Sequence, residues 1–364
     1  MSREPEANGV RATLADSAVA MLADRVLAAA AGGTALRIQG GGSKSFYGRT
    51  LHGELLDTRI CTGIVAYEPT ELVITARAGT PLAEIEEALA AHDQMLGFEP
   101  PHFGGGATIG GAVASGLSGP ARPYHGAARD FVLGVDVIDG RGQLLSFGGQ
   151  VMKNVAGFDV ARLLAGSLGT LGVLVQVSLR VLPRPRVQRT LIWRLSLAQA
   201  QQRMAELGSA PWPITAMCYD GDLLRLRAAG SEEAVSHACA ELAADIETDE
   251  LDYWRNLRDL RLPFFAADAR ALWRMSVPPT APDPSDVGVV VHDWGGAQRW
   301  LHAALDDTNV REHAAALGGH ASCFAVSDAP FAAPAAPLRA LMQRVKRGLD
   351  PQGIFNPGRL YEWL

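Results

Sequence analysis

Glycine-rich segments in the first half of the chain constrain its fold more than any other feature of the sequence. The chain contains 39 glycines, many of which gather in residues 37–44, 100–119 and 153–172. Glycine allows positive φ angles and leaves no side chain between the backbone and a neighbouring group. One such segment is compatible with an ordinary turn. Three in one half of the chain predict a backbone surface on which a large, flat ligand lies.

Residues 37–44 read RIQGGGSK, which predicts a binding site for phosphate. Three glycines before Ser43 and Lys44 allow successive backbone N–H groups to point into one concavity, and Lys44 adds a positive charge. A tight surface turn is the alternative interpretation, because triple glycine also occurs in ordinary loops. The common nucleotide motifs do not fit. Ser43 separates the glycines from Lys44, and neither the run at Gly40 nor the run at Gly104 has the spacing G-x-G-x-x-G.

Length and composition indicate a globular protein of two domains. The 364 residues are too many for one ordinary core, and 48% of them are hydrophobic and 20% charged. The net charge of −6 argues against a general nucleic-acid binder. No apolar run reaches the roughly 20 residues that span a bilayer, and the charged N-terminal segment does not resemble a signal peptide. We therefore expect a cytoplasmic protein that reaches the inner membrane only through partner subunits.

The cysteines and histidines are too scattered to predict a metal or iron–sulfur site. No two of the four cysteines have the spacing C-x-x-C, so we expect free thiols in a reducing compartment. The nine histidines include no His-x-His pair. We therefore expect no bound metal, and any iron–sulfur cluster that serves this chain must belong to another polypeptide.

One alternating segment predicts the strand that closes the first domain. In residues 173–181 an apolar set recurs at every second position, so strand geometry places this set on one buried face: Val173, Val175, Val177, Leu179 and Val181. The sequence Pro-Arg-Pro-Arg at residues 183–186 ends the alternation and predicts a domain boundary. We find no internal repeat of fixed period.

The hydrophobic patterns divide the chain into four parts. We expect a flexible N-terminus at residues 1–15, a first domain at 16–185, a second domain at 187–330, and a C-terminal segment at 335–364 that returns to the first domain. The second domain alternates predicted strands with predicted helices. This alternation favours an α+β fold in which helices cover one face of a sheet.

The order of several motifs resembles the FAD domain of the vanillyl-alcohol-oxidase and p-cresol-methylhydroxylase (PCMH) superfamily. The motifs are GGGS, GATIGG, RDFVLG with VDVIDGRG, KNVAGFD and GSLGTLGVL. Beyond them, LPFF, DWGGAQRW, ALGGHAS and LDPQGIFNPGRLY are similar to the flavin-binding E subunits of bacterial glycolate oxidase. The resemblance covers roughly residues 35–364. It implies an α+β fold, with a PCMH-type two-part FAD-binding domain and an α+β cap domain that contains an antiparallel sheet.

The resemblance also implies a cofactor site, although it names no catalytic residue. Five residues would hold the FAD pyrophosphate: Gly40, Gly41, Gly42, Ser43 and Lys44. Six more would line the path of the ribityl chain, diphosphate and ring: Pro101, Ala107, Thr108, Gly110, Gly111 and Ser118. The backbone of Val173 would meet the adenine edge, and Asn356 would return to the flavin ring. Lys153 would either meet the ring or pair with Asp159.

The sequence departs from the family pattern in two places. Members with covalently attached flavin often have histidine after the glycine run, whereas this chain has Ser43, so we expect FAD to be bound non-covalently. Related 2-hydroxy-acid dehydrogenases carry a metal-binding histidine cluster in the cap, which this sequence lacks. The missing cluster argues against substrate oxidation by this chain alone.

The function implied by the resemblance is oxidation of glycolate to glyoxylate, with D-lactate as a second substrate. A hydride would pass from the α-carbon to a flavin, and the electrons would leave through an iron–sulfur partner. The implied partners are a second FAD subunit and an iron–sulfur subunit of a glycolate oxidase complex. Two alternatives remain open: a self-sufficient FAD-dependent 2-hydroxy-acid dehydrogenase, and a non-catalytic assembly subunit whose flavin site is vestigial.

Overall fold

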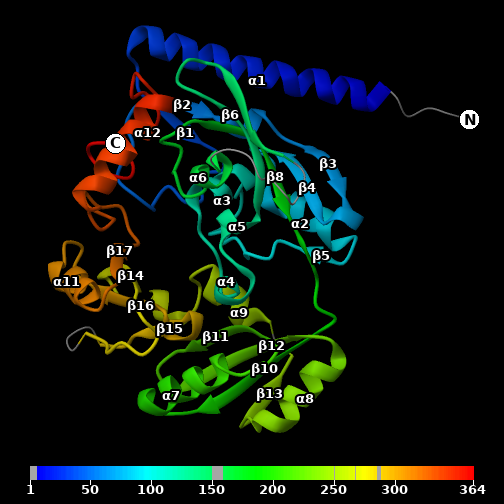
Figure 1. The fold of residues 1–364 in the computed structure, drawn as a ribbon, viewed down its shortest axis with the longest axis vertical. Coiled ribbons are helices and arrows are strands. Elements are labelled where there is room, and N and C mark those ends of the chain that lie inside the picture. The colour runs from blue at the N-terminus through cyan, green and yellow to red at the C-terminus, as the bar shows by residue number, and fades with distance from the viewer. Residues whose placement is uncertain (1–5, 150–158, 250, 267, 285–287) are drawn as a thin grey trace, which may run out of the picture.

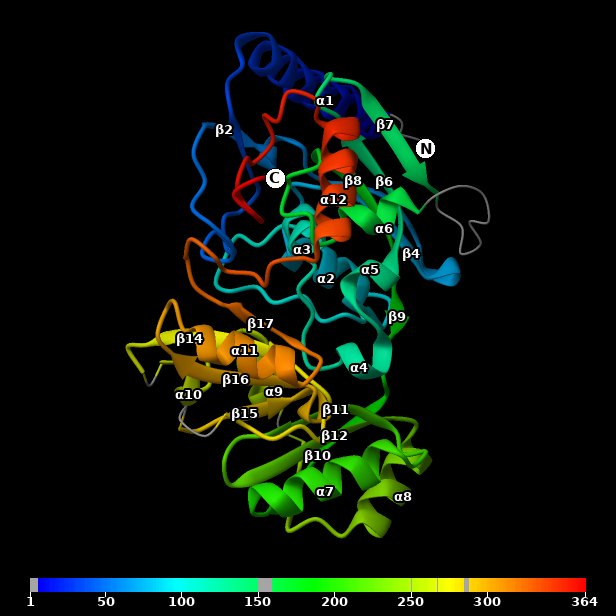
Figure 2. The same ribbon diagram turned by 60° about the vertical axis from the view of Figure 1, so that its left-hand side comes forward.

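The computed structural model describes residues 6–149, 159–249, 251–266, 268–284 and 288–364. They form two bodies, each built on its own antiparallel sheet, which lie one above the other in Figure 1. The first body runs from helix α1 (Glu6–Gly32) through strand β9 (Leu182–Pro183) and also contains helix α12 (Ala336–Leu349). The second body contains the elements between them, and Figure 2 shows the contact region from another side.

A five-stranded antiparallel sheet is the centre of the first body. Its order is β3–β4–β8–β6–β7, with bounds Ile64–Glu68, Val73–Arg77, Val173–Arg180, Val132–Ile138 and Leu144–Gly148. Four helices pack against it: α2 (Leu82–Ala90), α3 (Ile109–Ser115), α5 (Ala128–Phe131) and α6 (Val160–Leu164). Strand β9 pairs with β5 (Gln94–Met95) at the edge of this body.

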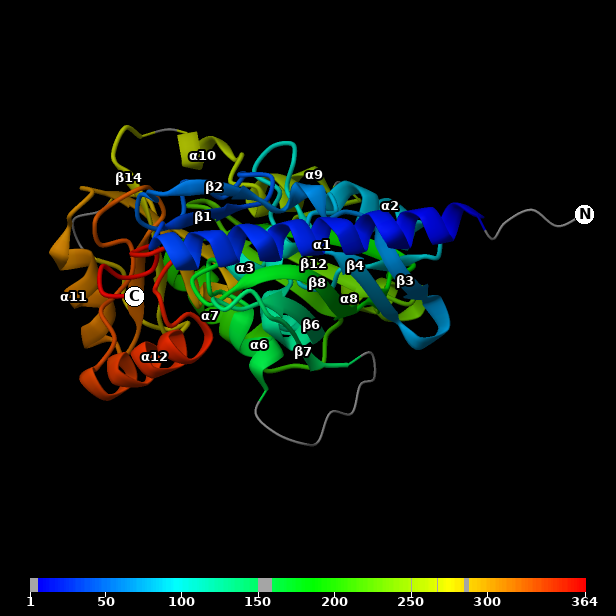
Figure 3. The ribbon, with the colours of Figure 1, turned by 90° about the horizontal axis from the view of Figure 1, so that it is seen from above.

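Helix α1 (Glu6–Gly32) lies across the first body, as Figure 3 shows from above. Its residues Leu22 and Val26 are buried in a separate core with the parallel strands β1 (Leu36–Gln39) and β2 (Glu54–Asp57). The helix begins at Glu6, within the stretch that the sequence patterns leave without structure. No proline occurs within it to break the helix.

A β-bulge in β8 changes the face to which its side chains point. The pairing of β8 with β6 skips Val175, which is therefore an extra residue in the ladder. Val177 packs in the core with helices α2 and α3, whereas Val173 and Val175 pack in the core with α1. The prediction of a single buried face for the five alternating residues is wrong, because alternation keeps one face only in an uninterrupted ladder.

An eight-stranded antiparallel sheet forms the second body and confirms the predicted antiparallel cap sheet. Its order is β13–β10–β12–β11–β15–β16–β14–β17, with bounds Ile246–Thr248, Val187–Arg194, Leu223–Gly230, Ile214–Tyr219, Val291–Asp293, Gln298–Ala303, Ala271–Ser276 and His320–Cys323. Helices α7 (Leu197–Gly208), α8 (Glu232–Leu242) and α11 (Thr308–Ala316) pack against it.

The second body contains a structural repeat that the sequence does not reveal. Elements β10 to β13 form one half, and β14 to β17 form the other. Counted within each half from the outer edge inward, the strands follow the same order of fourth, first, third and second, which is the order of a ferredoxin-like unit. The halves join where Tyr219 pairs with His292. Only the first half has a helix between its first two strands in the described part of the chain.

Side chains on one face of the second sheet pack toward the first body. Cys218, Trp300 and Phe324 share a core with Tyr47 and Leu117 of the first body. Three short helices lie in the same region: α4 (Arg122–His125), α9 (Asp252–Arg258) and α10 (Pro263–Ala266). The two bodies therefore meet through an apolar core rather than through a thin linker.

Candidate functional site

A cleft in the first body brings the glycine-rich segments together. It encloses about 800 Å³, part of it open to solvent, and we name it the glycine cleft. It lies between the end of β1, the start of α3, the turn before β8 (residues 165–172) and the C-terminal tail (residues 350–364). Nine of the predicted cofactor-binding residues line it: Gly40, Gly41, Gly42, Ser43, Lys44, Thr108, Gly110, Gly111 and Asn356.

The turn after β1 offers unpaired backbone donors to this cleft. Among the hydrogen bonds of the described residues, none is donated by a backbone N–H from Gly40 to Lys44. Gly42 has a φ of +72°, which glycine adopts without strain. A Cβ on Gly41 would lie 1.4 Å from the carbonyl oxygen of Gly106, so only glycine allows the two loops to come this close. The arrangement suits a ligand that accepts several hydrogen bonds, such as a phosphate.

Two cations add charge to the cleft: the half-buried Lys44 and the buried Arg359. Burial lowers the pKa of Lys44 to about 8, and its Nζ donates to Ser43 Oγ at 3.2 Å. Burial also lowers the pKa of Arg359 to about 10, and its guanidinium donates to the carbonyl oxygens of Arg49 at 2.6 Å and Ser45 at 3.1 Å. No aspartate or glutamate is found among the described residues that line the cleft. The cleft therefore favours an anionic ligand.

Asn356 ties three segments of the cleft together. Its Oδ1 accepts a hydrogen bond from the backbone N–H of Ile38 at 2.7 Å, and its Nδ2 donates to the carbonyl oxygen of Leu168 at 2.7 Å. Its own backbone N–H donates to Leu36 at 3.0 Å. The residue has a φ of +39°, a conformation that asparagine adopts more readily than most residues. Asn356 thus positions both β1 and the turn before β8.

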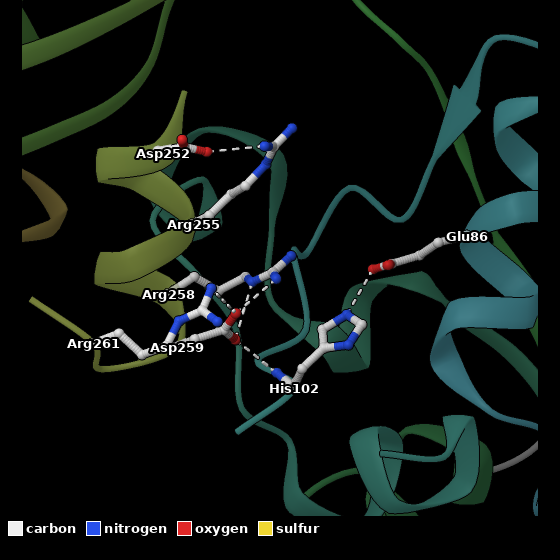
Figure 4. A network of polar contacts seen from close by, with 7 residues as sticks. All are labelled: Glu86, His102, Asp252, Arg255, Arg258, Asp259 and Arg261. Carbon is white, nitrogen blue, oxygen red and sulfur yellow. Dashed lines mark hydrogen bonds and ion pairs between the residues drawn. The ribbon is translucent and has the colours of Figure 1, made fainter. Parts of the chain in front are cut away.

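The second body positions the loop that faces Gly41. Figure 4 shows Asp259, at the end of α9, accepting a hydrogen bond from the backbone N–H of His102 at 2.8 Å. The ring of His102 lies 3.0 Å from a carboxylate oxygen of Glu86 in α2. His102 begins the 102–106 loop, whose last carbonyl contacts Gly41. The loop that packs against Gly41 is therefore held in place from the second body.

The structure places four predicted residues outside the lining of the cleft. Pro101 and Ala107 are buried at the two ends of the loop that faces Gly41. The hydroxyl of Ser118 accepts a hydrogen bond from the backbone N–H of Ala128 at 3.0 Å, at the start of α5. Val173 is fully buried in the core with α1. Lys153 belongs to a segment that lies outside the described residues.

Other lining residues were not singled out from the sequence. Leu168, Gly169 and Gly172 belong to the third glycine-rich segment, so that segment carried a signal for them. Arg359 follows Asn356 closely in the same C-terminal motif. Ser115 follows the GATIGG motif but has no distinguishing pattern of its own. The described residues contain no group of three or more side chains that could hold a metal ion, and none of their helices is long and apolar enough to cross a membrane.

Comparisons with known proteins place the chain in a family. A sequence profile described as an FAD binding domain matches residues 14–148. Glycolate oxidase subunit GlcE from Escherichia coli is 48% identical over 331 residues, which cover 91% of this chain and 94% of that protein. The chain belongs to the glycolate oxidase subunit GlcE family. The predicted membership among the flavin-binding E subunits is confirmed, and so is the predicted FAD-binding domain.

Two further relatives match part of the chain, and a solved structure matches its fold. Glycolate oxidase subunit GlcD from Bacillus subtilis is 36% identical over 85 residues, 23% of this chain and 18% of that protein. D-lactate dehydrogenase from Archaeoglobus fulgidus is 32% identical over 138 residues, 38% of this chain and 30% of that protein. A structure of alkyldihydroxyacetonephosphate synthase has a TM-score of 0.64 at 15% identity, covering 93% of this chain and 74% of the other. This likeness shows the fold alone and confirms the predicted α+β architecture.

Proposed function

We propose that the chain is the FAD-binding GlcE-type subunit of a complex that oxidises glycolate to glyoxylate. The observation that carries this proposal is the run of backbone N–H groups from Gly40 to Lys44, which have no partner among the described residues. They lie in a cleft whose described lining includes Arg359 and no acidic residue. This donor set matches the pyrophosphate of FAD. When bound, FAD supplies the hydride acceptor, while the protein binds and orients it.

In this proposal, different residues of the glycine cleft would bind different parts of the cofactor. Gly40–Lys44 and Arg359 would hold the pyrophosphate, and the Thr108–Gly111 segment would line the path beside it. The residues that would take the flavin ring are Ser115 and Leu168, because that end of the cleft adjoins a second cavity lined by both bodies. Asn356 supports the ring end by holding the carbonyl of Leu168.

We propose that FAD is held without a covalent bond. Among the described residues that line the glycine cleft there is no histidine, cysteine or tyrosine, and Ser43 follows the glycine run. Acid precipitation of the purified protein should therefore release all of the yellow colour into the supernatant. Flavin that stays with the denatured protein would refute this part of the proposal.

We propose that the chain works with a second FAD subunit and an iron–sulfur subunit. The sequence contains no ligand pattern for an iron–sulfur cluster and no nicotinamide fingerprint. A reduced flavin in this chain would therefore pass its electrons to an acceptor on another polypeptide. D-lactate is a second candidate substrate. All four cysteines are free, as is usual in a reducing compartment, and we keep the cytoplasm as the proposed location, with any contact to the inner membrane made through partners.

Reconstitution tests this function directly. The purified chain should retain FAD yet reduce an artificial dye poorly when given glycolate, and addition of both partners should restore activity. Omitting this chain from the trio should abolish it. Dye reduction by the single chain at the rate of the complex would favour a self-sufficient 2-hydroxy-acid dehydrogenase. A folded chain that binds no FAD would favour a non-catalytic assembly subunit.

A further inference from the structure

A second cavity lies between the two bodies, next to the glycine cleft. It encloses about 1330 Å³, part of it open to solvent, and it shares Ser115 and Leu168 with the glycine cleft. Three arginines line it, Arg122, Arg129 and Arg274, and the described lining residues include no aspartate or glutamate. We name it the arginine cavity. A lining with positive charge and no acidic residue attracts an anion.

Arg274 projects into this cavity from the second sheet. On β14 it pairs with Ser322 of β17 and with Trp300 of β16, whose ring packs toward the first body. Paired residues in adjacent strands share a face, so Arg274 points the same way. Its guanidinium donates to the hydroxyl of Tyr47 at 3.1 Å and lies 5.3 Å from the ring centre of Phe324. The guanidinium is therefore held in place from two sides.

Arg122 enters the cavity from the first body, on α4. Its guanidinium lies 4.5 Å from the ring centre of Trp294. Burial lowers the pKa of Arg122, and the charges of Arg274 and Arg129 lower it further, against a smaller opposing effect of Asp130. Within the described residues, no carboxylate lies within 4.0 Å of Arg122 or Arg274. Like charges held together without a counter-ion cost free energy, which an anion bound between them recovers.

His320, at the start of β17, lines the same cavity. Burial lowers the pKa of His320, and the charges of Arg274 and Arg122 lower it further. The lowered pKa favours the neutral imidazole, which can donate one hydrogen bond and accept another. Two guanidinium groups beside a neutral imidazole match a carboxylate with a neighbouring hydroxyl.

We propose that the arginine cavity binds the carboxylate of a small 2-hydroxy acid through Arg122 and Arg274. A guanidinium forms paired hydrogen bonds with a carboxylate, a geometry that lysine cannot reproduce. The acid would lie beside Ser115 and Leu168, at the end of the glycine cleft assigned to the flavin ring. The identity of the acid rests on the proposed function, whereas the anion site itself depends only on the arginines.

Oxalate is a suitable probe, because it is a small carboxylate without an α-hydrogen to transfer. Isothermal titration calorimetry on the full-length chain should detect oxalate binding. Arg274→Met and Arg122→Met should each weaken it about tenfold or more, the scale of one lost charged hydrogen bond. Arg274→Lys should weaken it less, because the charge remains and only the paired geometry is lost. Ethylene glycol, which has hydroxyls but no carboxylate, should give no binding heat.

Arg203→Met is the matched control. Arg203 also lies over a tryptophan, 5.5 Å from the ring centre of Trp193, but it belongs to α7 and does not line the cavity. Two results together would support the site. Arg203→Met should keep the wild-type oxalate affinity, and the cavity variants should lose affinity while keeping the wild-type melting temperature and FAD content. If Arg122→Met does not fold, the two Arg274 variants decide.

Two results would overturn the assignment. One is a folded wild-type chain that gives no oxalate binding, and the other is wild-type affinity in folded Arg274→Met. Failure of the proposed function is distinguishable, because it appears as a chain without FAD. Oxalate binding by such a chain, lost in Arg274→Met, would support the anion site while refuting the flavin function.

Discussion

The glycine cleft and the arginine cavity meet at Ser115 and Leu168 but are built in different ways. The glycine cleft is made largely of backbone, to which the side chains of Lys44 and Arg359 add charge. The Gly40–Lys44 turn offers its N–H groups, and missing side chains allow neighbouring loops to approach. The arginine cavity is made of side chains that distant segments bring together, with Arg122 from the first body and Arg274 from the second.

The difference teaches how each site should respond to mutation. A backbone site depends on the absence of side chains and on whatever holds the loops in place, so single additions or lost supports disturb the whole site. A side-chain site depends on a few charged groups, each of which can be removed with little change to the backbone. The following predictions test the backbone site, from the largest expected effect to the smallest.

The largest effect is expected from Lys346→Met, which removes a support of the glycine cleft. The buried ammonium of Lys346 donates to Asp350 at 2.8 Å and to the carbonyl oxygens of Thr170 at 2.7 Å and Phe355 at 2.9 Å. Without it, the carboxylate of Asp350 is buried without its cation, which costs about 3–5 kcal/mol. Urea unfolding should show this loss of stability, and FAD content should fall with it.

The control is Arg347→Met, at the next position of the same helix, where the side chain is exposed. It should change the free energy of unfolding by less than about 0.5 kcal/mol. Equal stability of Lys346→Met and Arg347→Met would show that the tail does not support the cleft.

The next effect is on FAD binding by Gly41→Ala. The added methyl group would lie 1.4 Å from the carbonyl oxygen of Gly106, so one of the two loops must move. We expect FAD affinity to fall about tenfold or more, equivalent to about 1.4 kcal/mol. Gly105→Ala is the matched control, because no atom lies within 4 Å of its added Cβ. Wild-type FAD affinity in folded Gly41→Ala would show that the turn is not the phosphate site.

A smaller effect on FAD affinity is expected at Asn356, because its loss adds no atom to the phosphate turn. Asn356→Ala removes the hydrogen bonds to Ile38 and Leu168, each worth about 0.5–1.5 kcal/mol, and places alanine at a φ of +39°. Asn356→Gly loses the same bonds but relieves the backbone strain. Both variants should bind FAD more weakly, and the alanine variant should also unfold at lower urea. Unchanged FAD affinity in both would mean that the tail is dispensable for binding.

The smallest effect is a pH dependence of FAD affinity that comes from Lys44. The pKa of Lys44 is lowered by burial from 10.5 to about 8, and a bound phosphate raises it again. FAD binding therefore takes up a proton, and the affinity should fall as the pH rises above about 8, by at most about tenfold per unit of pKa difference. Fluorescence titrations between pH 7 and 9.5 should show this decline, and Lys44→Met should remove it.

Folding stability responds to Lys44 in the opposite direction. Because its pKa is lower in the folded chain than in the unfolded chain, the unfolded chain binds more protons between about pH 8 and 10.5. The contribution of Lys44 to the free energy of unfolding therefore rises with pH in that range. A decline of stability that is lost in Lys44→Met would contradict the burial of this ammonium.

Most residues of the glycine cleft could be predicted from the sequence, because the glycine runs that form it are visible within short segments. The turn at Gly40–Lys44 and the segment at Thr108–Gly111 need small residues where they stand, and both line the cleft. The arginine cavity could not be predicted from the sequence. Arg122 and Arg274 lie far apart in the chain, and only the packing of the two bodies brings them to one cavity. No pattern around either arginine distinguishes it from the other arginines of the chain.

Two features of the fold escaped sequence patterns for a related reason. The bulge at Val175 depends on how β8 pairs with β6, which a single-strand pattern does not contain. The two halves of the second body share a strand order without a repeated sequence, because many side chains satisfy the same alternation. The antiparallel direction of the second sheet was expected from the family resemblance, because alternation within a strand does not set the direction of its neighbour.

The glycine cleft is completed only when two stretches of chain that lie far apart in the sequence meet. Phe355 forms a β-bridge with Leu36, and Asn356 bonds to Ile38, 318 positions away. The whole second body lies between these stretches in the sequence. Until the segment after the second body folds back onto the first body, β1 lacks this neighbour and the glycine turn lacks its supports. A chain cut within the second body would therefore have no complete glycine cleft.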